Sequence, residues 1–180
     1  FEDVNLTVFY KDSIAILGEN GTGKSTLIKM ALGQTPIDSG EIRLGSKLNI
    51  GYLPQEISFE DEDAKIIDYF SYRYNITIGE TRNELAKILF TDDDVFKKIC
   101  NLSGGEKTRL KLLTLIYEKS NVLILDEPTN HLDIDSRESL EEDLINYDGT
   151  IIFISHDRYF IDKVATRIAE IENKSLNVYN

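Results

Sequence analysis

The stretch that decides the fold runs from residue 18 to residue 26 and reads Gly18-Glu19-Asn20-Gly21-Thr22-Gly23-Lys24-Ser25-Thr26. A glycine, four free positions and then Gly-Lys-Ser is the spacing of a loop whose backbone N–H groups wrap a phosphate. Before it, residues 13–17 are apolar and branched, as in a buried strand. After it, residues 25–32 have a helical pattern, and a helix N-terminus adds partial positive charge. The pattern therefore predicts a phosphate-binding loop.

Two side chains of this loop have specific tasks in such a site. Lys24 is expected to reach the β- and γ-phosphates, and the Ser25 hydroxyl is expected to hold Mg²⁺. The alternative is a glycine-rich turn that only joins a strand to a helix. The strand and helix on either side favour the phosphate site over that alternative.

The composition bounds the class of protein. A length of 180 residues, 41% of them hydrophobic, predicts one globular domain. A net charge of −12 gives no general attraction to nucleic acid or anionic lipid, so any nucleic-acid contact must be local. The single cysteine, Cys100, cannot form an internal disulfide. Since no signal sequence or membrane span is evident, we expect a cytoplasmic protein without membrane insertion, and the start at Phe1 predicts a fragment of a longer chain.

Strands alternate with helices along the chain, which predicts an α/β fold with a mixed, mostly parallel core sheet. Alternating runs at residues 1–10 and 41–44 predict two antiparallel strands that pair near the nucleotide edge. Helical periodicity predicts a helical subdomain over about residues 56–119, within a single domain spanning 1–180. Further strands are expected at 48–53, 121–126, 150–155, 168–171 and 176–179, and further helices at 103–118, 136–147 and 161–166.

An acidic pair follows the apolar run at residues 122–125. Asp126 and Glu127 stand at the carboxyl end of that expected strand, where ligands bind in open α/β sheets. Asp126 suits the shell of Mg²⁺, and Glu127 is placed to polarise an attacking water. Such a pair also caps helices, but coupled to the phosphate loop it predicts a second part of the same site.

The segment Leu102-Ser103-Gly104-Gly105-Glu106 completes a set of motifs, and with it the chain resembles the ATP-binding cassette (ABC) ATPases. The resemblance implies a P-loop fold, ATP as ligand with Mg²⁺, and ATP hydrolysis. In this family Ser103, Gly104, Gly105 and Glu106 would contact the γ-phosphate held by an opposite cassette. The resemblance therefore implies a second cassette as partner, in the same parent chain or in a head-to-tail dimer.

Three more segments match the family in order. Gln55 resembles the glutamine that senses Mg²⁺ and the attacking water, and residues 130–133 resemble the loop that crosses the cassette interface. His156 resembles the switch histidine that hydrogen-bonds the γ-phosphate. For His131 a merely structural polar role stays open. The family's adenine-stacking aromatic lies a little over twenty residues before the phosphate loop, and only seventeen residues precede it here, so Phe1, Phe9 and Tyr10 are poor candidates.

The sequence of residues 126–133 and 155–160 resembles that of the ABC-F branch. The Ser-Gly-Gly-Glu-Lys segment at residues 103–107 resembles the second cassette of that branch. The resemblance implies a translation factor without a membrane domain that acts on the ribosome, its rRNA and tRNA, through parts outside these residues. Several members of the branch protect ribosomes from antibiotics. Two alternatives stay open, namely the ATPase subunit of an ABC membrane transporter and a nucleotide-binding module with little turnover of its own.

Overall fold

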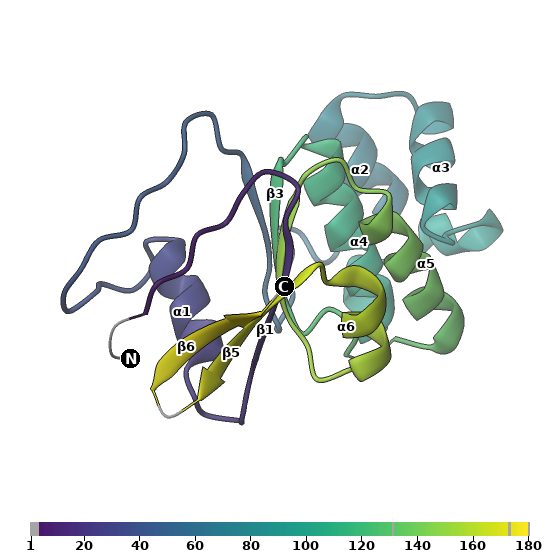
Figure 1. Cartoon of the computed structure of the whole chain (residues 1–180). Coiled ribbons are helices and arrows are strands. Elements are labelled where there is room, and N and C mark those ends of the chain that lie inside the picture. Colours follow the sequence, from purple (N-terminus) through teal and green to yellow (C-terminus); the bar gives the residue numbers. More distant parts are fainter. Residues whose placement is uncertain (1–3, 131, 173, 180) are drawn as a thin grey trace.

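The computed structural model describes residues 4–130, 132–172 and 174–179, and it is built on one six-stranded sheet (Figure 1). The strand order is β2-β3-β4-β1-β5-β6, and every pairing is parallel except the β5–β6 hairpin. The strands are β1 (Ser13–Gly18), β2 (Ile50–Leu53), β3 (Val122–Asp126), β4 (Thr150–Ile154), β5 (Arg167–Glu172) and β6 (Ser175–Tyr179).

Helices cover both faces of this sheet. They are α1 (Lys24–Ala31), α2 (Ile66–Tyr74), α3 (Ile78–Lys87), α4 (Gly104–Tyr117), α5 (Ile134–Ile145) and α6 (Arg158–Val164), with 3₁₀ turns η1 (Asp92–Phe96) and η2 (Ile99–Asn101). Alternate residues of β1 point to opposite faces. Ile14 packs in a cluster with Ile28 of α1, whereas Ala15 packs in a cluster with Leu140 of α5 and Phe160 of α6. The sheet is thus buried on both sides, which explains its near-continuous apolar strands.

A second hydrophobic core lies away from the sheet, between α2, α3 and α4. Its largest fully buried side chains are Phe70 and Phe90, and Leu110 and Leu113 of α4 join it. Leu112 of the same helix packs in the sheet cluster, so α4 connects the two cores. The helices expected between residues 56 and 119 are present, and the bounds of a subdomain there stay a prediction.

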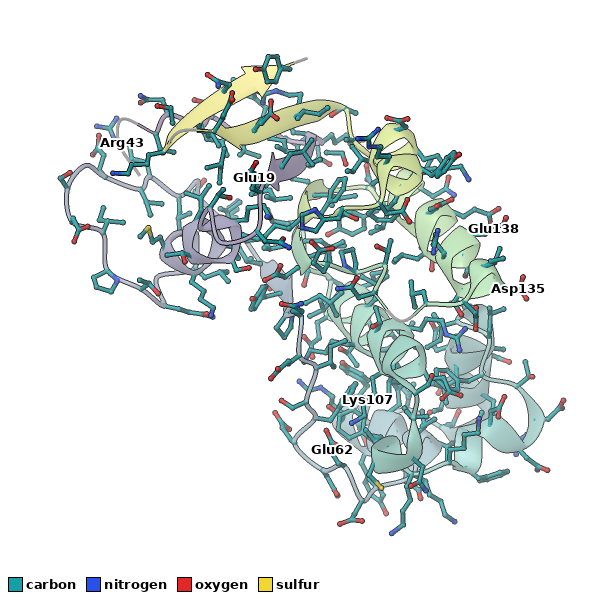
Figure 2. All side chains as sticks on the ribbon, turned by 90° about the horizontal axis from the view of Figure 1, so that it is seen from below. Glu19, Arg43, Glu62, Lys107, Asp135 and Glu138 are labelled. Atoms are coloured by element: carbon teal, nitrogen blue, oxygen red, sulfur yellow. The ribbon has the colours of Figure 1, made fainter. Side chains whose placement is uncertain are left out.

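An ion pair fastens the segment before α2 to α4. Lys107 Nζ lies 2.7 Å from Glu62 Oε2, and Figure 2 shows the two side chains side by side. This hydrogen bond is the largest cause that lowers the pKa of Glu62. In the described part of the chain, no helix is both long and apolar enough to cross a bilayer.

The expected α/β fold is confirmed, but the two expected N-terminal strands are wrong. Residues 4–10 keep the predicted alternation of exposure, yet they form no strand. Leu6 and Val8 pack against the cluster that contains Ile14 and Ile28. Residues 41–44 are exposed along their length, Leu44 by 60%. With one run lying on the core and the other in solvent, the two do not share a face to bury, and pairing gains little. The antiparallel strands of the fold are β5 and β6 instead.

Candidate functional site

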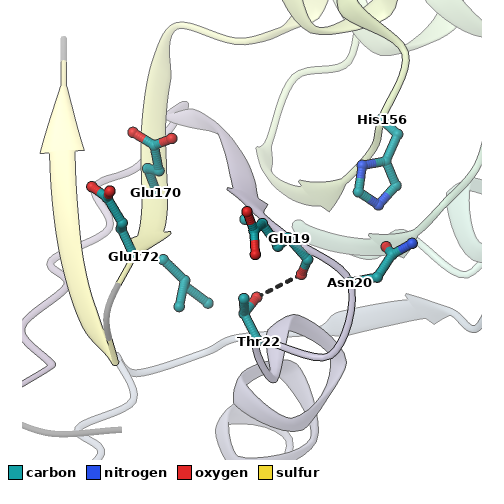
Figure 3. A pocket seen from close by; sticks show the side chains of 8 residues that line it. Glu19, Asn20, Thr22, His156, Glu170 and Glu172 are labelled. Atoms are coloured by element: carbon teal, nitrogen blue, oxygen red, sulfur yellow. Dashed lines mark hydrogen bonds between the residues drawn. The ribbon is translucent and has the colours of Figure 1, made fainter.

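The phosphate loop lies between β1 and α1, as the motif requires. Lys24 is buried, and its Nζ donates to the carbonyl oxygens of Gly18 at 2.8 Å and Glu19 at 2.9 Å. These two bonds hold the ammonium group across the concave side of the loop. Thr22 Oγ1 donates to the same Glu19 carbonyl at 2.9 Å, which narrows the loop (Figure 3). Helix α1 begins at Lys24 after Gly23, whose left-handed φ of 96° a side chain would strain.

Gly18 shows how closely this loop approaches its neighbours. A Cβ there would lie 2.8 Å from Thr22 Oγ1 and 2.9 Å from the Ile171 carbonyl oxygen, and φ is 150°. Only glycine fits without a shift of backbone. A tight glycine-rich loop of this kind before a helix fits a phosphate group.

The acidic pair lies at the end of β3, which β4 separates from β1 in the sheet. Asp126 ends β3 and is buried, while Glu127 takes a left-handed φ of 53° and donates its N–H to the Ile154 carbonyl at 3.0 Å. A non-glycine residue at such a φ stores strain of about 1–3 kcal/mol, which is typical of functional positions. Burial raises the pKa of Glu127 above its usual range and outweighs the opposing effect of nearby His156.

His156 follows β4 and faces this carboxylate. Its Nε2 lies 3.3 Å from Glu127 Oε1, and the histidine side chain is 55% exposed whereas that of Glu127 is 11% exposed. Strands β3 and β4 are paired with Asp126 opposite Ile154, so their ends bring the two residues together. The structure thus brings Glu127 and His156 together at the ends of β3 and β4. His131 lies outside the described residues.

A pocket of about 570 Å³ opens above the phosphate loop (Figure 3). It is lined by Gly18, Glu19, Asn20, Thr22, His156, Glu170, Ile171 and Glu172. Phe9 and Tyr10 do not line it, and in the described part of the chain none of its lining residues is a Phe, Tyr or Trp. The sequence reasoning missed Glu170 and Glu172, although their alternation around an apolar residue on a strand next to β1 could have indicated them.

A second, smaller pocket of about 100 Å³ contains four more of the expected residues. Gln55, Asp126 and Glu127 line it together with Gly104. No group of three His, Cys, Asp or Glu side chains among the described residues could hold a metal ion by itself. A carboxylate, a hydroxyl such as that of Ser25 on α1, and phosphate oxygens are nevertheless the ligands that suit Mg²⁺, so the residues present fit that ion.

The glycine-rich start of α4 lies apart from the phosphate loop pocket. Ser103 Oγ accepts from the Glu106 N–H at 3.2 Å, and Glu106 Oε2 accepts from the Ser103 N–H at 2.8 Å. This capping box leaves Ser103 and Gly104 exposed and Gly105 buried. Segment 103–106 contributes no residue to the pocket over the phosphate loop, while Gly104 lines the smaller pocket with Gln55, Asp126 and Glu127.

Comparison with known proteins identifies this set of motifs. Residues 1–130 match the family model described as ABC transporter. The chain belongs to the ABC transporter family. Membership of the ABC family makes the site at the phosphate loop a nucleotide-binding site.

The relatives include members of the F branch. The chain is 44% identical over 178 residues to YdiF of Bacillus subtilis, covering 98% of this chain and 28% of that protein. It is 37% identical to the ribosome protection protein VmlR of B. subtilis (98% and 32% covered) and 40% identical to ABC transporter F family member 5 of Arabidopsis thaliana (99% and 26%). The resemblance to the ABC-F branch is thereby confirmed, and the chain spans about a third or less of these relatives.

The fold is shared with solved structures. A model of ribosome-bound archaeal Pelota and ABCE1 superposes with a TM-score of 0.76 at 22% identity, covering 96% of this chain and 31% of that one. At this identity the likeness supports the fold alone. It confirms the ABC P-loop architecture expected from the sequence.

Proposed function

We propose that the chain is an ATP-hydrolysing cassette of an ABC-F type protein that acts on the ribosome in the cytoplasm. The observation that carries the proposal is the Glu127–His156 pair, 3.3 Å apart at the strand ends beside the phosphate loop. The ABC-F relatives, one of them named a ribosome protection protein, support the ribosome as partner. Contacts with rRNA and tRNA would come from parts of the protein outside this chain.

Each site residue has a task that its position supports. Lys24 and the loop amides of residues 18–26 would stabilise phosphate charge, since Lys24 Nζ lies against the loop at the Gly18 and Glu19 carbonyls. Ser25, Gln55 and Asp126 would hold Mg²⁺, which supplies charge neutralisation on the phosphates. Thr26 stands in the first turn of α1, where its N–H adds to the anion site.

Glu127 and His156 would act on water and the γ-phosphate. A largely buried carboxylate whose pKa is raised is a better proton acceptor for water near neutral pH than an ordinary glutamate. His156, within hydrogen-bonding reach of that carboxylate and exposed to the pocket, would donate to the terminal phosphate. Together they would place the attacking water in line with the leaving group.

A second cassette would complete the site. Segment 103–106 presents a helix N-terminus with an exposed serine and glycine, a suitable anion partner for a nucleotide bound elsewhere. We infer that ATP joins two cassettes and that hydrolysis separates them. The second cassette would lie in the same parent chain or in a head-to-tail dimer, and this chain would be the second of the pair.

The test is co-sedimentation of the full-length protein with ribosomes. The variant Glu127→Gln keeps the shape of the site and removes the proton acceptor. With ATP present the variant should stay bound to the ribosome, and without ATP it should be released. The control is the double variant Glu127→Gln/Lys24→Ala, which lacks the lysine that binds the phosphates. Its ribosome binding should not respond to ATP. Membrane association without ribosome retention would favour the ATPase subunit of a transporter and contradict the proposal.

A further inference from the structure

An ion pair connects the start of α5 to the start of α6, beside His156. Arg137 Nη1 lies 3.0 Å from Asp157 Oδ2, and the Asp157 side chain is only 17% exposed. The other oxygen of this carboxylate, Oδ1, accepts from the N–H groups of Tyr159 at 3.0 Å and Phe160 at 3.3 Å. Asp157 therefore caps α6 with one oxygen and binds Arg137 with the other.

Arg137 is itself fixed by the loop that precedes α5. Its N–H donates to the carbonyl of Asp133 at 3.0 Å, and Asp133 Oδ1 accepts from the Ser136 N–H at 2.7 Å. Arg109 of α4 donates to the Ser136 hydroxyl, so α4 contacts the same turn. The position of Arg137 is thus tied to that of Asp133, the last residue of the segment 130–133.

The Arg137 side chain is 37% exposed, and only part of its guanidinium is enclosed. Its Nε is buried and, in the described part of the chain, has no hydrogen-bond partner. A buried donor without a partner is costly, and the Asp157 carboxylate is the compensating contact of the group. The Arg137–Asp157 pair therefore holds the start of α5 and the start of α6 together.

Ser155 and Asp157 fix the backbone on either side of His156. The Asp157 N–H donates to Ser155 Oγ at 3.1 Å, and Ser155 Oγ lies 3.4 Å from Thr129 Oγ1. The imidazole is more than half exposed, and its contact with Glu127 spans 3.3 Å. Its placement therefore depends on where residues 155–157 are held.

We propose that Arg137 is a positioning residue, which places His156 over the pocket by holding Asp157 against the start of α5. The inference rests on the proposed role of His156 in turnover. In this arrangement the position of Asp133 is coupled to that of the histidine, because one short chain of contacts joins Asp133, Arg137 and Asp157.

The same two helices carry a matched control. Lys163 of α6 lies 2.6 Å from Glu141 of α5, whose side chain is 5% exposed. This pair also joins α5 to α6, but it involves the last turn of α6 rather than the residue after His156. Its loss should lower stability without altering the site.

The experiment measures ATP turnover of the full-length protein with Arg137→Met, Arg137→Lys, Asp157→Asn and the Arg137→Met/Asp157→Asn double variant. Asparagine caps helices about as well as aspartate, so Asp157→Asn removes the ion pair while keeping the cap. We expect kcat to fall about tenfold or more for Arg137→Met and for Asp157→Asn, with the KM for ATP changed less than about twofold. Arg137→Lys should restore much of kcat, and the double variant should be no worse than either single variant.

Lys163→Met and His156→Ala complete the set. Lys163→Met should lower the melting temperature at unchanged kcat. If Arg137→Met and Asp157→Asn behave like Lys163→Met, or if their effects on kcat add, the inference is overturned. If His156→Ala retains full turnover, the proposed role of His156 fails first. Loss of turnover in His156→Ala but not in Arg137→Met or Asp157→Asn overturns the Arg137 inference alone.

Discussion

At the scale of single residues, Gly18 couples the fold to the site. A Cβ at this position would meet the Thr22 hydroxyl and the Ile171 carbonyl below 3.0 Å, and the positive φ adds strain. We expect Gly18→Ala to lower the free energy of unfolding by about 1–3 kcal/mol and to weaken ATP binding at least about tenfold, because the loop must open. Urea unfolding and titration with a fluorescent ATP analogue measure the two effects.

Gly33, just after α1, supplies the control for this substitution. Its φ is +70° and a Cβ there meets nothing within 4 Å, so Gly33→Ala adds backbone strain without a clash. The variant should lose stability by about 1 kcal/mol and bind ATP normally. Equal ATP affinity for Gly18→Ala and wild type would contradict the close approach described for Gly18.

At the scale of elements, two helices begin with the same capping box. Thr77 and Glu80 start α3, and Ser103 and Glu106 start α4. Thr77→Ala and Ser103→Ala should each reduce stability by about 1 kcal/mol, since each removes one cap. Only Ser103→Ala should also lower ATP turnover of the full-length protein, because only α4 is proposed to face a nucleotide on another cassette.

This comparison is measured by urea unfolding and steady-state hydrolysis on the same preparations. Two variants with equal losses of stability and unequal turnover would agree with the proposed role of α4. Equal turnover would mean that Ser103 serves the helix alone.

The carboxylates of these boxes also predict the response to acid. The N–H and hydroxyl of Thr77 lower the pKa of Glu80. Burial alone would raise the pKa of Glu106, but the bonds from Ser103 and Lys97 outweigh it and lower the value. Because both pKa values are lower in the folded chain, their stabilisation is present above the ordinary glutamate value of 4.5 and is lost as the pH falls through the lowered values.

We therefore expect the free energy of unfolding to decline below about pH 4.5, and the double variant Glu80→Gln/Glu106→Gln to decline less steeply. Urea titrations at a series of pH values measure the slopes. Glu138→Gln, which removes an exposed carboxylate of α5 (Figure 2), is the control and should keep the wild-type slope. A double variant with an unchanged acid slope would rule out these boxes as its source.

At the scale of the whole molecule, the sequence could predict the features that depend on the parallel strands. Glycine spacing located the loop after β1, and apolar runs located β3 and β4; because parallel strand ends meet at one edge, Glu127 and His156 had to lie near the loop. Alternation at residues 4–10 predicted exposure correctly but not pairing, since pairing needs a partner run on the same face. The Arg137–Asp157 pair had no local pattern, because twenty residues separate the two side chains and only tertiary packing joins them.

Glu127→Gln in the full-length protein tests the central claim most directly, with ATP binding and ATP hydrolysis measured on the same sample. Replacing the carboxylate by an amide of equal size should leave ATP affinity within about threefold of wild type and lower turnover about a hundredfold, because the proton acceptor for water is lost. Glu138→Gln is the matched control and should hydrolyse ATP like wild type. Unchanged turnover in Glu127→Gln, with binding intact, would contradict the account of this site.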